Sequence, residues 1–339
     1  MGKKREYGFD NLRGILIFLV VLGHLLESCG SFRGAGFLYR TIYAFHMPAF
    51  LFLTGYFARY VREKIIQGML IPYILFQTAY LLFDGWLNNG EVELQYTMPH
   101  WLLWYLMVCI GYHLLLPMYE TDAFRQQLLA LGITFSLSLL AGFDETVGYR
   151  LSLSRFLVFQ PWFLLGYYCR RGGWLGMIDR WNRDRLLLLK LLLTAAVCVL
   201  ALMMHLFAFR PELLYGAHSY GNLDYGPAER LVAGIAALAW IGFGFLVLLP
   251  LVRWRLPMLT ALGQNTMPVY LLHGFVVRYI QKRQPGMLET PWQVLLVAVL
   301  ILAVLGNPVT GAVFRDIFSG KRTRVAVPRN LCPHRMVTE

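Results

Sequence analysis

Three groups capable of chemistry lie near the start of the chain, in a stretch that is otherwise apolar. Residues 9–28 read FDNLRGILIFLVVLGHLLES and contain Arg13, His24 and Glu27. Ten residues separate Arg13 from His24, so helical steps of about 100° bring both side chains to one face, roughly 16 Å apart along the axis. Asp10 precedes Arg13 by three residues, close to the same face. Because ionisable groups within a membrane helix usually face the protein interior and mark functional sites, this face is a candidate site.

Each of these residues also has a structural interpretation. Arg13 lies close to the boundary of the apolar run, where its long side chain can reach lipid phosphates. Glu27 can lie beyond the hydrocarbon, and His24 can be an ordinary buried histidine. Their shared face favours a functional site over three separate structural explanations.

Further polar groups occur deep in other apolar segments. His46 lies in FHMPAFLFLTGYF, and His273 ends LGQNTMPVYLLH. For both, the alternative is a core histidine bonded to a backbone carbonyl. Arg155 lies within LSLSRFLVFQPWFLLGYY and is expected either to bind a carboxylate or phosphate, or to pair with Asp144 or Glu145.

Aromatic residues open another apolar segment, PHWLLWYLM. Trp101 and Trp104 are typical of anchors at a membrane interface. They are also of the type that stacks on sugar rings, but the anchor interpretation is favoured.

The elements that position these groups are membrane helices. The chain has 339 residues, 58% of them hydrophobic and 15% charged, with a mean hydropathy of +0.53, whereas soluble domains have about 25% charged residues. Apolar stretches of membrane-spanning length predict an all-α, polytopic bundle of ten transmembrane helices. The predicted ranges are 11–28, 37–57, 65–85, 101–118, 126–142, 151–169, 186–208, 230–252, 259–279 and 292–316.

Basic residues set the expected orientation. Most of them fall in loops on the side of the N-terminus, which predicts that both termini are cytoplasmic. The formal charge of +12 is explained by these loops, so nucleic acid is not an expected partner. The apolar run after the basic N-terminus has no small-residue cleavage site, so we expect a retained first helix. We expect one transmembrane domain over 1–318 and a basic cytoplasmic tail over 319–339.

Several classes of site are not supported by the sequence. The five cysteines form no C-x-x-C pair, so neither a disulfide framework nor a metal site is expected. No phosphate-binding P-loop and no G-x-S-x-G nucleophile turn is present.

At this point the residues resemble a known family. The stretches DNLRGILIFLVVLGH, FHMPAFLFLTGYF, HWLLWYL and LGQNTMPVYLLH are similar to those of the membrane acyltransferase-3 family. The likeness is to bacterial O-acetyltransferases that modify surface polysaccharides, including the fucose 4-O-acetylase-like group. It runs from the first predicted helix to the ninth, and the spacing of Arg13 and His24 is its most specific element. The resemblance implies ten helices, an acyl-CoA donor taken from the cytoplasm, and transfer to a hydroxyl of a glycan.

Catalytic roles follow from this resemblance as hypotheses. Arg13 and His24 match the family's essential pair, with His24 as general base on a sugar hydroxyl. Glu27 is expected to orient the ring of His24. His46 is a second candidate, either as base or as a donor to the developing oxyanion. Direct transfer and a two-step route through an acyl-imidazole on His24 both stay open.

Binding roles are assigned in the same way. Arg13, with Arg59 and Arg62, is expected to hold the phosphates of acetyl-CoA, because an arginine fork suits phosphate. Candidate acceptor-binding residues are Arg155, Trp104 and His273. The implied partners are a glycan or lipid-linked sugar, the lipid bilayer and proteins of polysaccharide biosynthesis, at the plasma or inner membrane of a bacterium.

Two rival functions also involve buried charges in a membrane protein. A transporter or flippase of a glycan or lipid-linked intermediate also lines its path with buried charges, but it is expected to show paired broken helices in an internal repeat, which we do not find. A sensor or scaffold without chemistry does not need Arg13, His24 and Glu27 on one face.

Overall fold

The computed structural model of the chain is all-α over the residues that it describes, as predicted. It describes residues 7–28, 32–90, 92, 94–174, 176, 183–207, 209–223 and 225–318. The predicted cytoplasmic tail, 319–339, lies outside the described residues, as do the basic residues before Tyr7.

Each predicted range is occupied by one helix or by consecutive helical pieces. The α-helices are α1 (Tyr7–Ser28), α2 (Ala35–Tyr56), α3 (Arg62–Ile65), α4 (Ile71–Asn88), α5 (Trp104–Leu115), α6 (Phe124–Leu140), α7 (Leu153–Arg171), α9 (Arg183–Leu206), α10 (Pro227–Phe243), α11 (Leu249–Leu251), α12 (Pro257–Gln264), α13 (Thr266–Arg283), α14 (Pro291–Leu305) and α15 (Pro308–Phe318). Two π-helical turns, Ile66–Leu70 and Gly244–Leu248, join α3 to α4 and α10 to α11.

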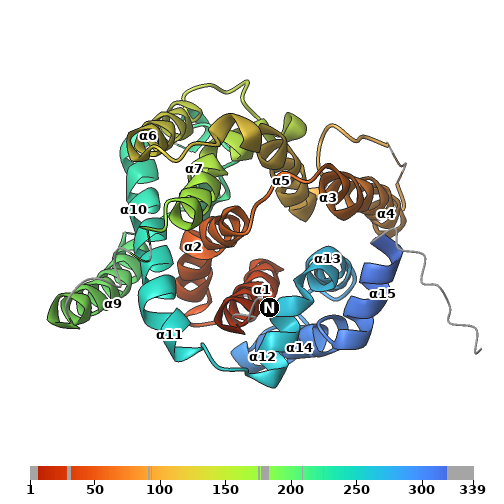
Figure 1. Cartoon of the computed structure of the whole chain (residues 1–339). Coiled ribbons are helices and arrows are strands. Elements are labelled where there is room, and N and C mark those ends of the chain that lie inside the picture. The colour runs from red at the N-terminus through yellow and green to blue at the C-terminus, as the bar shows by residue number, and fades with distance from the viewer. Residues whose placement is uncertain are drawn as a thin grey trace, which may run out of the picture.

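The first helix lies inside the bundle. Figure 1 shows α1, α2 and α13 surrounded by the other helices, with α9 at the periphery. Helix α1 packs against α2, α12, α13 and α14. Within the most apolar window of each helix, 67% of α1 is buried but only 11% of α9. Most of α1 is therefore enclosed by protein, as expected for a membrane helix that carries functional groups.

Two glycines let α2 and α7 approach closely. A Cβ atom on Gly55 would lie 1.9 Å from the carbonyl oxygen of Phe163, and one on Gly166 would lie 1.9 Å from that of Phe52. Small residues at such crossings allow backbone contact between membrane helices. This contact fixes α2, which carries His46, against α7, which carries Arg155.

Fewer helices than predicted are long enough and apolar enough to span a membrane. In the described residues, five helical segments are long and apolar enough to cross a membrane: Tyr7–Ser28, Arg62–Asn88, Trp101–Tyr119, Arg183–Leu206 and Pro227–Leu251. A sixth results if α14 and α15, bent by 54° at their break, form one span. The count of ten spans is thus not confirmed, and the orientation of the termini stays a prediction.

Candidate active site

The candidate site is a cavity of about 390 Å³ in the middle of the bundle, called here the central cavity. Helix α1 contributes His24 and Glu27 to its wall, and α2 contributes Tyr43 and His46. The remaining wall comes from the segment 99–105, from α7, from the loop 214–218 and from the start of α13. Polar groups from distant parts of the sequence therefore meet in one enclosed space.

His24 is held by a second histidine. Its Nδ1 lies 2.8 Å from Nε2 of His273, and the two rings are parallel within 3°, with their centroids 5.1 Å apart. The ring of Trp101 lies against His24 on another side, at 4.7 Å between centroids. His273 is fully buried behind His24 and does not line the cavity. In the structure His273 therefore contacts His24 from outside the cavity wall, and its predicted role in acceptor binding stays a prediction.

A backbone carbonyl determines which nitrogens of this pair carry protons. Nδ1 of His273 lies 2.8 Å from the carbonyl oxygen of Val269, so this nitrogen must be the donor. In a neutral ring, Nε2 of His273 is then an acceptor, and Nδ1 of His24 must donate to it. The neutral His24 ring consequently has its lone pair on Nε2. A general base or a nucleophile needs such a lone pair.

The carboxylate of Glu27 has a different partner from the one expected. Glu27 was predicted to orient the ring of His24, but the described contact to that ring comes from His273. Glu27 instead accepts a hydrogen bond from the hydroxyl of Tyr43, at 3.2 Å. Glu27 is exposed to the central cavity, where it is available to a ligand. One turn along α1 places the carboxylate beside Tyr43 of α2, and its expected role in orienting His24 stays a prediction.

His46 is buried and has its own fixed tautomer. Its Nδ1 donates to the carbonyl of Ile42, one turn earlier, at 2.8 Å. The neutral ring therefore presents Nε2 as an acceptor. Of its two predicted roles, a base agrees with this tautomer, whereas an oxyanion donor requires a protonated ring. The ring of Tyr43 packs edge-on against His46, at 4.8 Å.

Arg155 and Trp104 lie together in the wall of the central cavity. The guanidinium of Arg155 lies over the rings of Trp104 and Tyr149, at 5.1 and 5.3 Å. Its Nε donates to the carbonyl of Tyr215, at 3.1 Å. The predicted alternative, an ion pair with Asp144 or Glu145, is not among the salt bridges of the described residues. This arrangement presents a cation and an aromatic surface to the cavity.

The loop 214–218 lines the central cavity together with Arg155. The side chains that it presents there are uncharged at neutral pH. Burial raises the pKa of Tyr215 to about 12. Burial, together with the Arg155 cation, lowers the pKa of His218 below its ordinary value of 6.5. Both side chains line the cavity, so its charged groups at this end are Arg155 and Glu27.

A second cavity, of about 370 Å³, adjoins the first and is called here the side cavity. It lies between the α3–α4 segment, the α12–α13 break and α15, and both Lys64 and Arg315 line it. Met267 lines both cavities. Met267 is therefore a wall residue common to the two spaces.

The predicted phosphate-binding arginines lie outside both cavities. Arg13 forms an ion pair with Asp10, at 3.8 Å, and its guanidinium lies 4.4 Å from the ring centroid of Phe57. Asp10 also accepts from Gln264, at 3.0 Å, and Gln264 lines the side cavity. Arg13 is thus connected to the wall of the side cavity through the side chains of Asp10 and Gln264.

Arg59 and Arg62 are exposed on the segment that leads into α3. They are close in sequence to Lys64, which does line the side cavity. Neither of the two arginines lines a cavity in the described residues.

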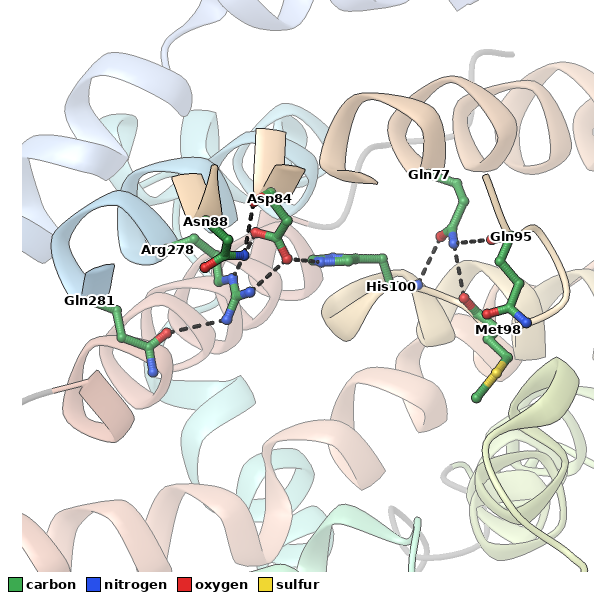
Figure 2. A network of polar contacts seen from close by, with 8 residues as sticks. All are labelled: Gln77, Asp84, Asn88, Gln95, Met98, His100, Arg278 and Gln281. Carbon is green, nitrogen blue, oxygen red and sulfur yellow. Dashed lines mark hydrogen bonds and ion pairs between the residues drawn. The ribbon is translucent and has the colours of Figure 1, made fainter. Parts of the chain in front are cut away.

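A polar network fixes the segment that brings Trp101 to His24 (Figure 2). Asp84 on α4 accepts from Nη2 of Arg278 on α13, at 2.6 Å, and from Nε2 of His100, at 2.7 Å. Gln77 accepts from the backbone N–H of His100, at 2.8 Å, and donates to the carbonyl of Met98, at 2.9 Å. These contacts anchor residues 98–100 immediately before Trp101.

Breaking this network is expected to destabilise the protein. Asp84→Asn leaves Arg278, only 22% exposed, without its counter-charge, so we expect a loss of about 2–4 kcal/mol of unfolding free energy. Thermal unfolding of the purified protein measures it. The control is Asp122→Asn, in the exposed pair with Arg171, where the change should stay within about 1 kcal/mol. Equal effects of the two substitutions would contradict a structural role for Asp84.

Several residues of the site were not singled out from the sequence. They are Tyr43, Tyr149, Tyr215, His218 and Met267, all of which line the central cavity. Only Tyr43 carried a usable signal, because it precedes His46 by three residues and so shares its helical face. The others lie on elements whose approach to α1 depends on the packing of the whole bundle.

Comparisons with known proteins identify the family of the chain. The sequence profile described as "Acyltransferase domain" matches residues 6–306. The chain is 34% identical to the nodulation protein NolL of Sinorhizobium fredii over 124 residues, which cover 30% of this chain and 33% of NolL. It is 36% identical to NolL of Mesorhizobium japonicum over 72 residues, 19% of each chain. The matched segments thus span about a third and a fifth of these relatives' lengths. No solved structure matches.

The match to the family profile extends from the helix that carries Arg13 and His24 to the end of α14. It therefore includes every site residue predicted from the sequence, whereas Arg315 of the side cavity lies beyond the matched range. The chain belongs to the acyltransferase-3 family of membrane acyltransferases.

Proposed function

We propose that the protein transfers an acetyl or another short acyl group from acyl-CoA to a hydroxyl of a cell-surface or exopolysaccharide sugar. The observation that carries this proposal is the His24–His273 pair, which presents an imidazole lone pair at the wall of the central cavity. The acyl donor follows from the family; acetyl-CoA and the sugar acceptor are our assignments.

In the reaction, Nε2 of His24 removes the proton of the sugar hydroxyl as its oxygen attacks the thioester carbonyl. The tetrahedral intermediate collapses with loss of the CoA thiolate, which takes the proton from the His24 imidazolium. The products are the O-acyl sugar and free CoA. His273 accepts the Nδ1–H of His24 throughout, so the ring keeps its orientation while its charge changes.

A two-step route uses the same geometry. Nε2 of His24 attacks the thioester, CoA leaves, and the sugar oxygen then takes the acyl group from the imidazole. In that route His46, whose Nε2 is an acceptor, removes the proton of the sugar hydroxyl and releases it to solvent, which balances the proton that the departing CoA thiolate takes up. A covalently acylated His24 distinguishes the two routes.

The donor is proposed to enter through the side cavity. Lys64 and Arg315 supply positive charge to its wall, and Arg13, Arg59 and Arg62 add charge around it. These residues hold the phosphates of CoA, while the flexible arm passes Met267 and brings the thioester to His24. Under this proposal the side cavity faces the cytoplasm, with the termini on that side and ten spans in the plasma or inner membrane.

The acceptor is proposed to occupy the other half of the central cavity. Trp104 and Tyr149 offer aromatic faces to a sugar ring, while Arg155 and Glu27 offer charge-assisted hydrogen bonds to its hydroxyls. Two substrates thus reach His24 from opposite ends of the bundle.

Narrowing the passage at Met267 is expected to block the donor. Met267→Trp should lower kcat/KM for acetyl-CoA about tenfold or more, because Met267 lines both cavities. Met267→Ala should preserve acetyl transfer and increase the rate with longer acyl-CoA donors. Rates with a series of acyl-CoA chain lengths measure both effects. If the tryptophan variant used acetyl-CoA like the wild type, the donor route would lie elsewhere.

The test of the proposed function is transfer of radiolabelled acetyl from acetyl-CoA in membranes that contain the protein, with extracted cell-surface glycans as acceptors. Label in the glycan fraction with the wild type, but not with His24→Ala, is the expected result. If the glycan fraction stays unlabelled while another hydroxyl compound gains label, the acceptor assignment is wrong.

A further inference from the structure

A small chamber lies beside the central cavity and shares Tyr43, Phe159 and Leu214 with it. Its volume is about 40 Å³, enough for a few water-sized groups, since one water needs about 10–15 Å³. Most of the remaining wall is apolar, including Phe135 and Trp162. The chamber therefore adjoins the proposed acceptor half of the site.

One cation, Arg230 in the first turn of α10, is buried in the wall of this chamber. The residue is 7% exposed. Its Nη1 donates to the carbonyl of Leu213, at 3.1 Å, and its guanidinium lies 5.8 Å from the ring centroid of Tyr220. Within the described part of the chain, Nε and Nη2 are buried without a hydrogen-bond partner. No acidic side chain there forms a salt bridge with Arg230.

The two unpartnered nitrogens form one edge of the guanidinium. Nε–H and one Nη2–H point in parallel from that edge, which is the geometry that binds two oxygens of a phosphate or carboxylate. A buried charge without partners is strongly unfavourable. Binding to the Leu213 carbonyl explains only Nη1, so a structural role leaves the free edge without an explanation.

We propose that this chamber binds the phosphate group of a lipid-linked acceptor, with the free edge of Arg230 as its ligand. The inference rests on the proposed function and specifies the acceptor class. Just beyond Arg230, the outer face of α10 is apolar and exposed, with Leu231, Val232 and Ile235 between 41 and 51% exposed. A lipid chain can lie against this face while its phosphate enters the chamber and its sugar reaches the central cavity.

The test measures the binding of dodecyl phosphate to the full-length protein, purified in a neutral maltoside detergent. Binding is detected as a shift in the Tm of the protein. We expect a dose-dependent rise in Tm for the wild type. For Arg230→Met the affinity should fall about tenfold or more, because a charge-assisted, bidentate contact is lost. The control is Arg210→Met, since Arg210 is an exposed arginine of the preceding loop and the substitution changes the net charge equally.

Ligand-free stability separates a binding role from a structural one. If Nε and Nη2 of Arg230 have no hydrogen-bond partner until the phosphate binds, Arg230→Met should have a Tm equal to or above that of the wild type. A clear fall in Tm, with no loss of dodecyl phosphate binding, would overturn the proposal. A second variant, Gly234→Val, enlarges a wall residue of the chamber and leaves Arg230 in place; it should also weaken binding.

Two further ligands test the chemical class. Inorganic phosphate at the same concentration should shift the Tm much less than dodecyl phosphate; an equal shift would overturn the lipid assignment. Dodecanoate in place of dodecyl phosphate should bind more weakly, and tighter binding would overturn the assignment to phosphate. None of these measurements requires acyl transfer, so their failure is distinguishable from failure of the proposed function.

Discussion

Replacing His24 by alanine is expected to lower the rate of acetyl transfer roughly 10²- to 10⁴-fold, the contribution of a positioned general base. The loss should appear in kcat, because His24 acts on the reacting atoms and does not hold the distant parts of either substrate. The protein should remain folded, since the side chain that fills the space behind His24 is His273, which is unchanged. Steady-state rates with labelled acetyl-CoA measure the effect.

A histidine elsewhere provides the matched control. His205 on α9 is exposed and packs edge-on against Phe37, so His205→Ala should leave the rate unchanged. Acid quenching during a single turnover adds a second readout, because label attached to the wild-type protein and absent from His24→Ala indicates the two-step route. Transfer by His24→Ala at near-wild-type rate would exclude His24 as base or nucleophile.

Removing the partner of His24 is expected to have the next largest effect. His273→Leu eliminates the acceptor for Nδ1–H of His24, so the ring can rotate and place its proton on Nε2, where the lone pair is needed. Loss of a residue that orients a reactive imidazole typically reduces activity about 10- to 100-fold. The reduction should appear in kcat with little change in KM for acetyl-CoA, as determined from full saturation curves.

A conservative substitution distinguishes orientation from packing. The side-chain oxygen of His273→Gln can accept from Nδ1 of His24, so this variant should retain most of the activity that His273→Leu loses. Thermal unfolding of both variants checks that their stability is comparable. If glutamine and leucine reduced kcat equally at equal stability, the hydrogen bond between the two histidines would have no part in the reaction.

Much of the fold was available from the sequence because apolar stretches bounded by Gly, Pro and charge report helices directly. Each of the ten predicted ranges is helical, and the family resemblance is confirmed by the profile match. The number of membrane spans did not follow from the sequence as directly as the helices did. Helix α6 has 17 residues, short for a membrane span, and α13 carries His273 and Arg278 within its length.

Helical periodicity also determined that His24 belongs to a polar face of α1, because residues along one helix keep a fixed angular relation. Periodicity did not determine which residues of the other helices contact that face. His273 is 249 residues away from His24, and the angle at which α13 packs on α1 is set by side chains throughout the bundle. The same is true of Trp101, whose position depends on the contacts of Asp84 with His100 and Arg278.

The sequence by itself determined the helical class and the family, and it predicted a candidate histidine on the first helix. Only the tertiary structure decided which side chains contact that histidine and Glu27. It also decided that Met267 lines both cavities. The physical reason is that depth along a helix follows from counting residues at a constant rise. The direction in which a neighbouring helix presents its side chains depends instead on the close packing of all the helices together.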